Sequence, residues 1–492
     1  MVGAGTAGCA IAARVSEAGN KSVLVLEAGP DYHEAELPKD LSSGGRNSLF
    51  KHDWGYRHRP TPRSVRFPFP RGKVVGGSSA VNTCIALRGQ PEDFDEWADL
   101  GLDEWSWEKC LPAFVRCERD LDFSDDFHGN DGPLPIRRHP KSEWSAWQAA
   151  FVEACQQLGY AYCPDSNAPG SAGVGPHAMN KIEGRRISVS EVYLTEEVRQ
   201  REGFTLLSSV DVRRVLFENK RVVGVEVVMA GETRVLKAPT VVLCAGSTNT
   251  PGLLLHSGVG PSEQLAELGV AEIASNPAVG ARLLDHPGTA IFFRPRWGAP
   301  TNRKDPLIQT VLRYSSTGSG PPDMLLQPGS KLAFPRVDFP LVSLMTALGK
   351  PKGHGRIYWK RGSRRPHFEP NFFSDASDRE TGRAAMRIAF ELSQTKPMRE
   401  LATPFFPRRK TLASPERMWK WVRQVCDSGY HPSGTVPMGV DSDPTAATDQ
   451  YGRVRGVEGL VVADTSLMPT ITSSNTNLPT LMIGERFGEW LA

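Results

Sequence analysis

Three glycines and one acidic residue near the N-terminus have the types and spacing that suit a dinucleotide. Gly3, Gly5 and Gly8 form a G-x-G-x-x-G run, and Glu27 follows Gly8 by 19 residues, after the apolar segment 23–26. Glycine at these places permits a tight turn, a close approach of the pyrophosphate and close packing of the next helix. The N-terminus of that helix then presents unpaired N–H groups to the phosphates. An acid at the position of Glu27 binds ribose hydroxyls, which favours an adenosine without a 2′-phosphate.

A histidine and an asparagine near the C-terminus could carry proton chemistry. His431 begins the run His-Pro-Ser-Gly-Thr, and Asn475 follows it by 44 residues. An imidazole titrates near neutral pH and suits a general base, whereas an amide can donate to an oxygen on which negative charge develops. Taken singly, His431 is better explained as a surface or capping residue and Asn475 as a turn residue.

The elements that must position these residues are visible as periodic segments. Helices are expected over residues 9–15, 105–117, 144–158, 250–257 and 378–393. Strands are expected over 240–246, ending in small residues, and over 355–360, and a β-meander over 204–235. Residues 31–70 read as a surface excursion, and residues 288–345 as a Pro-rich, irregular stretch with strand-like pieces such as 323–327. Only Met1 and Val2 precede Gly3, so either the start of the sequence is misplaced, or the chain is truncated, or the first strand is a stub, and a cost to cofactor retention and stability is expected. The glycine- and serine-rich run 71–82 can donate many N–H groups to a buried ligand.

Length, net charge and cysteine content limit the classes of protein to which this chain can belong. The 492 residues are too many for one simple core, so two domains are expected. The net charge of +3, without a long basic run, argues against nucleic acid or an anionic membrane as partner, and no apolar segment is long enough to span a bilayer. The eight cysteines show neither a C-x-x-C pair nor zinc spacing. We therefore expect reduced core thiols, no metal site and a cytoplasmic location.

Five blocks of sequence together resemble the glucose–methanol–choline (GMC) flavoprotein oxidoreductases over nearly the whole chain. They are residues 3–27, 71–89, 245–261, 279–287 and 431–480. Residues 128–133 and 475–480 are more similar to the bacterial aryl and furanic alcohol oxidases, including the 5-hydroxymethylfurfural oxidase type.

The resemblance implies an α/β (α+β) fold in which a Rossmann-like FAD-binding domain is joined to a discontinuous substrate domain on a mostly antiparallel sheet. We expect the FAD-binding domain to comprise residues 1–140, 191–287 and 426–492, and the substrate domain to comprise residues 141–190 and 288–425. The implied FAD-binding residues are Gly3, Gly5, Gly8, Glu27, Val74, Gly77, Asn82, Thr83, Val212, Asp464, Asn477 and Thr480. Some members attach FAD covalently through a histidine beside the position of Asn82, and Val81 stands there, so non-covalent FAD is expected.

The resemblance also gives the two C-terminal residues a joint role. His431 occupies the position of the catalytic base and Asn475 that of its partner, while Tyr430 and Trp54 are candidate pocket residues. His286 is expected to be a structural hydrogen-bonding residue, and His256 to have no role. The implied activity is oxidation of a primary, activated alcohol to an aldehyde, with electrons passing to O₂ in an oxidase or to a quinone or other carrier in a dehydrogenase. The photodecarboxylases on this scaffold lack the His/Asn pair, and an NAD-dependent Rossmann enzyme would leave residues 71–82 without a purpose. A non-catalytic protein that never binds FAD stays open because of the short first strand.

Overall fold

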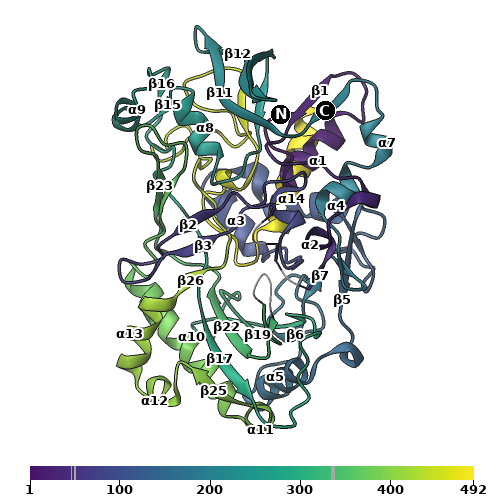
Figure 1. The fold of residues 1–492 in the computed structure, drawn as a ribbon, viewed down its shortest axis with the longest axis vertical. Coiled ribbons are helices and arrows are strands. Elements are labelled where there is room, and N and C mark those ends of the chain that lie inside the picture. The colour runs from purple at the N-terminus through teal and green to yellow at the C-terminus, as the bar shows by residue number, and fades with distance from the viewer. Residues whose placement is uncertain (46, 49–50, 334–337) are drawn as a thin grey trace.

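A parallel sheet lies close to both chain ends in the computed structural model, which describes residues 1–45, 47–48, 51–333 and 338–492 (Figure 1). Strand β1 (Val23–Leu26) pairs with β10 (Phe204–Leu207), and β14 (Val241–Leu243) pairs with β27 (Leu460–Val462). Val2 bridges Leu26 on one side and Leu243 on the other. The short first segment therefore joins the two pairs into one sheet through a single residue.

Two helices from opposite ends of the sequence pack against each other beside this sheet. Helix α1 (Thr6–Val15) follows the glycine turn, and α14 (Asn477–Leu491) is the last helix of the chain. A Cβ on Gly484 would lie 2.9 Å from the Cα of Ala7, so the two backbones approach closely there. This packing brings the start of α14 to the glycine turn.

The predicted β-meander exists, but its first strand belongs elsewhere. Strands β11 (Val210–Glu218), β12 (Arg221–Met229) and β13 (Glu232–Lys237) form an antiparallel sheet of three. Residues 204–207, expected in the meander, instead form β10 of the parallel sheet. Short alternating segments look alike in sequence whether their partner is adjacent or distant, which explains the difference.

A seven-stranded antiparallel sheet forms the lower part of the molecule in Figure 1. Its order is β25 (Ala402–Phe406), β17 (Pro287–Pro295), β22 (Val342–Leu348), β19 (Met324–Gly329), β18 (Thr310–Tyr314) and β6 (Gly173–Pro176), and β26 (Asp427–Ser428) pairs with β17. The stretch 288–345, expected to be irregular with strand-like pieces, is more regular than expected, because about half of its described residues lie in strands. The prolines misled because Pro287 and Pro295 stand at the two ends of β17, where proline is tolerated.

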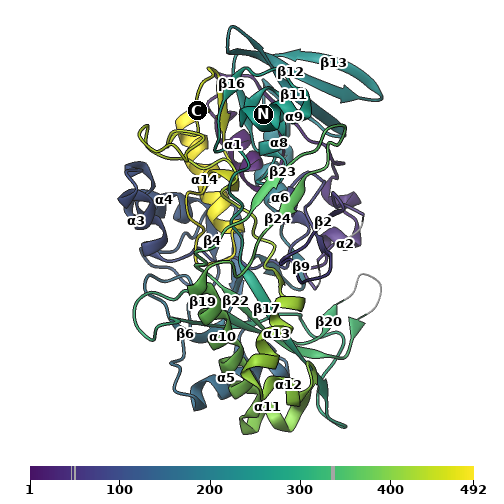
Figure 2. The same ribbon diagram turned by 90° about the vertical axis from the view of Figure 1, so that its left-hand side faces the viewer.

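Helices cover one face of this sheet and leave the other face toward the middle of the molecule (Figure 2). The covering helices are α5 (Ala146–Gln157), α10 (Ala376–Gln394), α11 (Lys396–Leu401), α12 (Arg409–Leu412) and α13 (Pro415–Val425). Ile291, Phe293, Leu326 and Leu344 are buried against them. Because side chains alternate along a strand, the neighbours of these residues face the other way.

The remaining helices and strands are short and mostly connect these layers. The hairpin β2 (Tyr56–His58) and β3 (Phe67–Phe69) and helix α2 (Lys39–Ser42) lie in the expected excursion 31–70. The others are α3 (Pro91–Asp99), α4 (Trp107–Cys117), α6 (Val189–Tyr193), α7 (Glu196–Arg199), α8 (Thr250–His256), α9 (Ser262–Leu268), β4 (Glu118–Asp120), β5 (Leu134–Arg138), β7 (Ala178–Met179), β8 (Lys181–Ile182), β9 (Arg185–Arg186), β15 (Val259–Gly260), β16 (Ala274–Ser275), β20 (Leu332–Ala333), β21 (Asp338–Phe339), β23 (Arg356–Tyr358) and β24 (His367–Glu369).

A buried charge network surrounds His128, the first residue of the 128–133 block. Its Nδ1 lies 3.1 Å from carboxylate oxygens of both Glu118 and Asp120, and its Nε2 lies 2.9 Å from Asp165. Burial lowers the pKa of His128, but hydrogen bonds to the three carboxylates outweigh it and raise the pKa to about 11. The three acids also face two arginines, Arg88 on Glu118 and Arg138 on Asp120 and Asp165. Three positive groups balance three negative ones, so this acidic cluster needs no metal ion.

Two further expectations concern the cysteines, as reduced core thiols, and membrane-spanning segments. All eight cysteines are free, and all but Cys163 are buried. Within the described residues, no helix has the length and apolar character needed to cross a membrane.

Candidate active site

A cavity of about 1260 Å³ runs between the parallel sheet and the open face of the seven-stranded sheet. It exceeds the range of about 300–1,000 Å³ that is usual for small-ligand sites. Gly3, Gly5 and Glu27 line one part of it, and His431 and Asn475 line another. The cavity thus connects the two groups of residues that the sequence singled out.

The nucleotide end is built on the glycine turn. Gly3 has a φ of +99°, and a Cβ there would lie 2.5 Å from the carbonyl oxygen of Cys244, so only glycine fits. Gly5 caps α1, and the Cα of Gly77 lies 4.0 Å from the place of a Gly5 Cβ. Two backbones therefore meet at the start of α1, where N–H groups can face an anion.

Glu27 is held rigidly at this end. Its carboxylate accepts hydrogen bonds from the backbone N–H of Ala4 (2.9 Å) and of Gly29 (2.8 Å). Burial raises the pKa of Glu27, and these N–H donors oppose the rise. The carboxylate keeps spare acceptor capacity beside the cavity, as a ribose partner requires.

The C-terminal block supplies the opposite wall. Asp464 accepts from the Gly246 N–H (2.9 Å) and the Thr250 hydroxyl (2.6 Å), and so ties β27 to the start of α8. Asn477 begins α14, and its Oδ1 accepts from the Thr6 hydroxyl at 2.9 Å. In the described part of the chain its Nδ2 has no partner, so it can donate to a ligand.

Several buried polar atoms on the cavity wall lack a protein partner among the described residues. They include Nδ2 of Asn477, Nε of Arg71 and Nε2 of His256. Because buried polar groups are normally satisfied, these atoms fit a large polar ligand better than an apolar one. The donor-rich turn, the free polar atoms and the size of the cavity all suit FAD.

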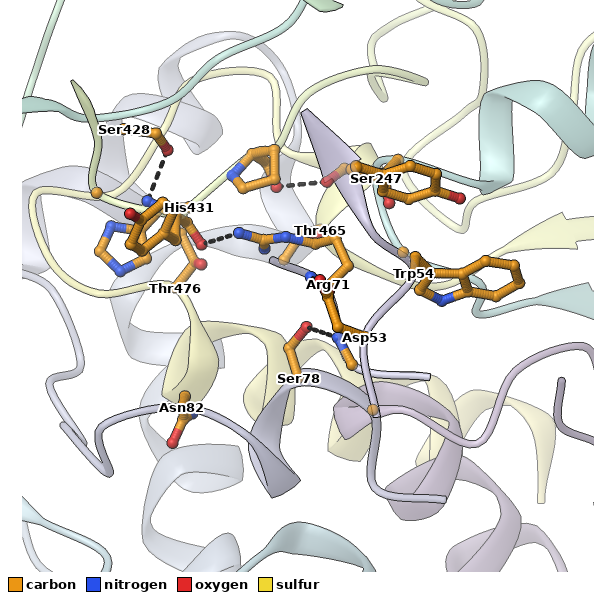
Figure 3. A pocket seen from close by; sticks show the side chains of 18 of the residues that line it. Asp53, Trp54, Arg71, Ser78, Asn82, Ser247, Ser428, His431, Thr465 and Thr476 are labelled. Atoms are coloured by element: carbon orange, nitrogen blue, oxygen red, sulfur yellow. Dashed lines mark hydrogen bonds between the residues drawn. The ribbon is translucent and has the colours of Figure 1, made fainter. Parts of the chain in front are cut away.

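Hydrogen bonds to Asp285 and Arg71 hold the backbone at His431 and at Tyr430 before it. The backbone N–H of His431 donates to Asp285 at 3.0 Å, and the Ser428 hydroxyl donates to the other oxygen of that carboxylate. Tyr430, just before it, has a φ of +65°, a strained value for a residue with a side chain. The guanidinium of Arg71 donates to the Tyr430 carbonyl at 2.7 Å. Figure 3 shows that Arg71 extends toward His431.

A chain of hydrogen bonds assigns the protons on His431. His286 Nε2 faces the Thr472 carbonyl at 2.9 Å, and a carbonyl only accepts, so this nitrogen carries the proton. In a neutral His286, Nδ1 is then an acceptor, and His431 Nδ1 must donate to it across 2.9 Å. His431 Nε2 is left with a lone pair, which accepts from Asn475 Nδ2 at 3.0 Å. The lone pair and the amide face each other on the cavity wall.

The surroundings keep both imidazoles neutral. Burial, the neighbouring His286 and Arg71 hold the pKa of His431 well below its usual value. Burial is also the main reason that the pKa of His286 falls to about 4. An unprotonated imidazole with a fixed lone pair is the state that a general base needs.

The predicted site residues do not all reach the cavity. Those that line it are Gly3, Gly5, Glu27, Gly77, Asn82, Thr83, Val212, Asp464, Asn477, Thr480, His431, Asn475, Tyr430 and Trp54. Gly8 does not line it, and a Cβ there would lie 2.1 Å from the Gly3 carbonyl oxygen, so its place is in helix packing. Val74 is buried in an apolar cluster with Val81 instead of lining the cavity.

Sequence reasoning underrated four side chains. His286 bonds directly to the imidazole of His431, and His256, expected to be idle, lines the cavity. The guanidinium of Arg71 reaches the carbonyl of Tyr430, and Gln327 lies on the cavity wall. No local pattern marks such residues, because their importance comes from what lies opposite them in space.

The chain matches the family model described as GMC oxidoreductase in both of its parts, over residues 1–288 for the N-terminal part and 351–484 for the C-terminal part. It belongs to the GMC oxidoreductase family. It is therefore an FAD-dependent oxidoreductase that acts on alcohols.

Individual relatives are similar over nearly the full length. The chain is 32% identical over 520 residues to an oxygen-dependent choline dehydrogenase of Vibrio vulnificus (strain YJ016), covering 99% of this chain and 92% of the relative. It is also 32% identical over 524 residues to the 5-(hydroxymethyl)furfural oxidase of Methylovorus sp. (strain MP688), covering 99% and 97%. The crystal structure of pyridoxine 4-oxidase from Mesorbium loti superposes with a TM-score of 0.91 at 28% identity, covering 99% and 98% of the two chains. The expected GMC fold is confirmed.

Proposed function

We propose that this GMC oxidoreductase oxidises an uncharged primary alcohol with an apolar, aromatic or furanic body to the aldehyde, with His431 as base and non-covalent FAD as hydride acceptor. The observation that carries the proposal is the lone pair of His431 Nε2, fixed by His286 and facing Asn475 on the cavity wall. The electrons are proposed to pass to O₂, giving H₂O₂.

His431 and Asn475 are proposed to remove the hydroxyl proton of the alcohol and to stabilise the oxygen that it leaves. Nε2 of His431 has a single lone pair, so the alcohol hydroxyl must take the place of the Asn475 N–H that faces it. The hydroxyl proton then moves to Nε2, while Nδ1–H stays bonded to His286. The Nδ2 group of Asn475 donates to the substrate oxygen as negative charge develops there. FAD, when bound, takes up the hydride from the carbinol carbon, which completes the aldehyde.

The residues proposed to hold FAD are those of the two walls. Gly3, Gly5 and the start of α1 would hold the pyrophosphate, and Glu27 the ribose. Asn82, Asp464 and Asn477 would lie along the rest of the cofactor. Because Val81 carries no nucleophile, attachment is proposed to be non-covalent.

Among the described residues, the carboxylates near His431 are already engaged by protein partners, which supports an uncharged substrate. Asp285 accepts from the His431 N–H and the Ser428 hydroxyl. Asp427 is bonded to His58 Nε2 at 2.8 Å and to the Tyr430 hydroxyl at 3.1 Å, and Asp53 accepts from the Arg71 N–H. The wall opposite is apolar, with Phe292 and Met345 among its side chains.

Two alternatives follow from specific observations. The choline dehydrogenase relatives and the rings of Phe292 and Trp421 on the cavity wall favour a quaternary ammonium alcohol held by cation–π contact. A dehydrogenase that delivers electrons to a quinone or another carrier would use the same base.

The test is reduction of the bound flavin without oxygen. The purified protein is expected to be yellow, and to bleach anaerobically with benzylic or furanic alcohols faster than with choline. His431→Ala is expected to slow this bleaching by about 10²-fold or more. Unchanged bleaching in that variant would remove His431 from the mechanism. Peroxide formation in air then separates an oxidase from a dehydrogenase.

A further inference from the structure

The open face of the seven-stranded sheet forms two rows of side chains along the cavity. Strand pairing places Gly288, Ala347 and Leu325 in one row, and Ala290, Met345 and Gln327 in the next. The first row is nearer to the base, because Gly288 pairs with Asp427 and lies two residues after His286. The second row is two residues, or roughly 7 Å, farther along the strands.

Gln327 brings a polar group to a wall that is otherwise apolar in these rows. Its Oε1 lies 3.0 Å from Nε2 of His177, a histidine whose side chain is fully buried. Burial lowers the pKa of His177 to about 3, so its ring is neutral and carries one N–H. That N–H donates to Oε1, since a carbonyl oxygen can only accept.

This hydrogen bond fixes the orientation of the carboxamide. With Oε1 turned to His177, the NH₂ group of Gln327 is on the cavity side, where it has no partner among the described residues and is not enclosed by protein. His177 is itself held in place, because its backbone N–H donates to the Gln309 carbonyl at 2.9 Å. Because His177 already orders the NH₂ group of Gln327, little further side-chain entropy is lost when a ligand accepts a hydrogen bond from it.

We propose that Gln327 is a specificity-determining residue that donates a hydrogen bond to an oxygen at the end of the substrate remote from the reacting carbinol. The class of substrate is then an alcohol with an apolar ring and a carbonyl, ether or hydroxyl oxygen across the ring. Gln327 is one row farther along the strands than Gly288 and two strands across from it, or roughly 12 Å between the two backbones. This separation leaves room for an aromatic ring between the base and the amide. This inference rests on the proposed alcohol oxidation and refines its substrate.

The test compares two alcohols of similar size, 4-methoxybenzyl alcohol with a distal oxygen and 4-ethylbenzyl alcohol without one. Gln327→Leu is expected to lower kcat/KM for the methoxy alcohol by about tenfold to a hundredfold relative to the wild type, because a donor built for an acceptor is lost. The ethyl alcohol is expected to change by less than about twofold. Gln327→Glu, which keeps the size but lacks the NH₂ donor, is expected to show the same selective loss. Met345→Leu, in the same row, is the control that should affect both alcohols alike.

The outcomes distinguish a failure of the role proposed for Gln327 from a failure of the proposed alcohol oxidation. An equal loss on both alcohols in Gln327→Leu would mean a structural role and would overturn the assignment. A wild type that oxidises neither alcohol would overturn the proposed function itself, and this inference with it. The dissociation constants of 4-methoxybenzaldehyde and 4-ethylbenzaldehyde, read from the flavin spectrum of each variant, give a second measurement that does not depend on turnover. In Gln327→Leu, only the dissociation constant of 4-methoxybenzaldehyde is expected to rise.

Discussion

His286 is predicted to control which nitrogen of His431 carries the proton, and the change His286→Leu tests this. The leucine removes the acceptor that faces His431 Nδ1 at 2.9 Å. The base-competent form of His431 then has a buried Nδ1–H without a partner, which costs about 1–3 kcal/mol. The other tautomer, with the proton on Nε2, escapes this cost because Asn475 can turn its oxygen toward it.

The cost translates into a rate. If the competent tautomer becomes less stable by about 1–3 kcal/mol, its ratio to the other tautomer falls by about 5- to 150-fold. The limiting rate of flavin reduction at saturating alcohol is expected to fall by up to the same factor. Anaerobic stopped-flow absorbance at the flavin band measures this rate directly, without interference from reoxidation.

A matched variant distinguishes a change in the tautomer of His431 from a general disruption of the site. His286→Gln keeps an acceptor oxygen for His431 and an amide donor for the Thr472 carbonyl, which His286 Nε2 contacts at 2.9 Å. It is expected to retain most of the rate that His286→Leu loses. The reasoning is refuted if His286→Leu, with a native flavin spectrum and melting temperature, reduces its flavin at the wild-type rate, or if the two variants lose equally.

Three further predictions concern other parts of the molecule. Asn475→Ala is expected to cost roughly 2–4 kcal/mol of transition-state stabilisation, seen as a lower limiting rate of flavin reduction, and a loss confined to substrate affinity would contradict it. Denaturation of the protein is expected to release its yellow colour into the supernatant of an ultrafilter, whereas colour kept with the chain would indicate covalent FAD. The His128 network is expected to fail in acid. Burial raises the pKa of Asp165, but His128 and Arg138 lower it further, so its stabilisation is present above about pH 4 and is lost as the pH falls. Asp165→Asn is therefore expected to lower the melting temperature strongly at pH 7, in line with about 3–5 kcal/mol for a broken buried pair. The effect is expected to be smaller at pH 3, where the unfolded chain takes up the proton while the folded protein still holds Asp165 ionised, and a larger effect at pH 3 than at pH 7 would count against the network.

Much of the nucleotide-binding region could be predicted because its signals are local. A glycine turn, a helix and a strand that ends in an acid occupy residues 3–27, and each constrains the backbone within a few residues. Helices such as α5 and α10 were likewise expected within two residues of their observed ends. The seven-stranded sheet was harder to predict, because several of its strands between 287 and 348 pair with partners far along the chain, and β17 has a proline at each end.

The sequence by itself determined the family, a glycine turn of the type that suits a dinucleotide, and the identity of the candidate base and its partner. Only the tertiary structure decided that His286 fixes the tautomer of His431, that Gly8 and Val74 pack away from the cavity, and that His177 aims the amide of Gln327 into it. The physical reason is that a residue type limits which hydrogen bonds a side chain can make, whereas its orientation depends on partners that the fold brings from distant segments, here 145 residues away for His431 and 150 for Gln327.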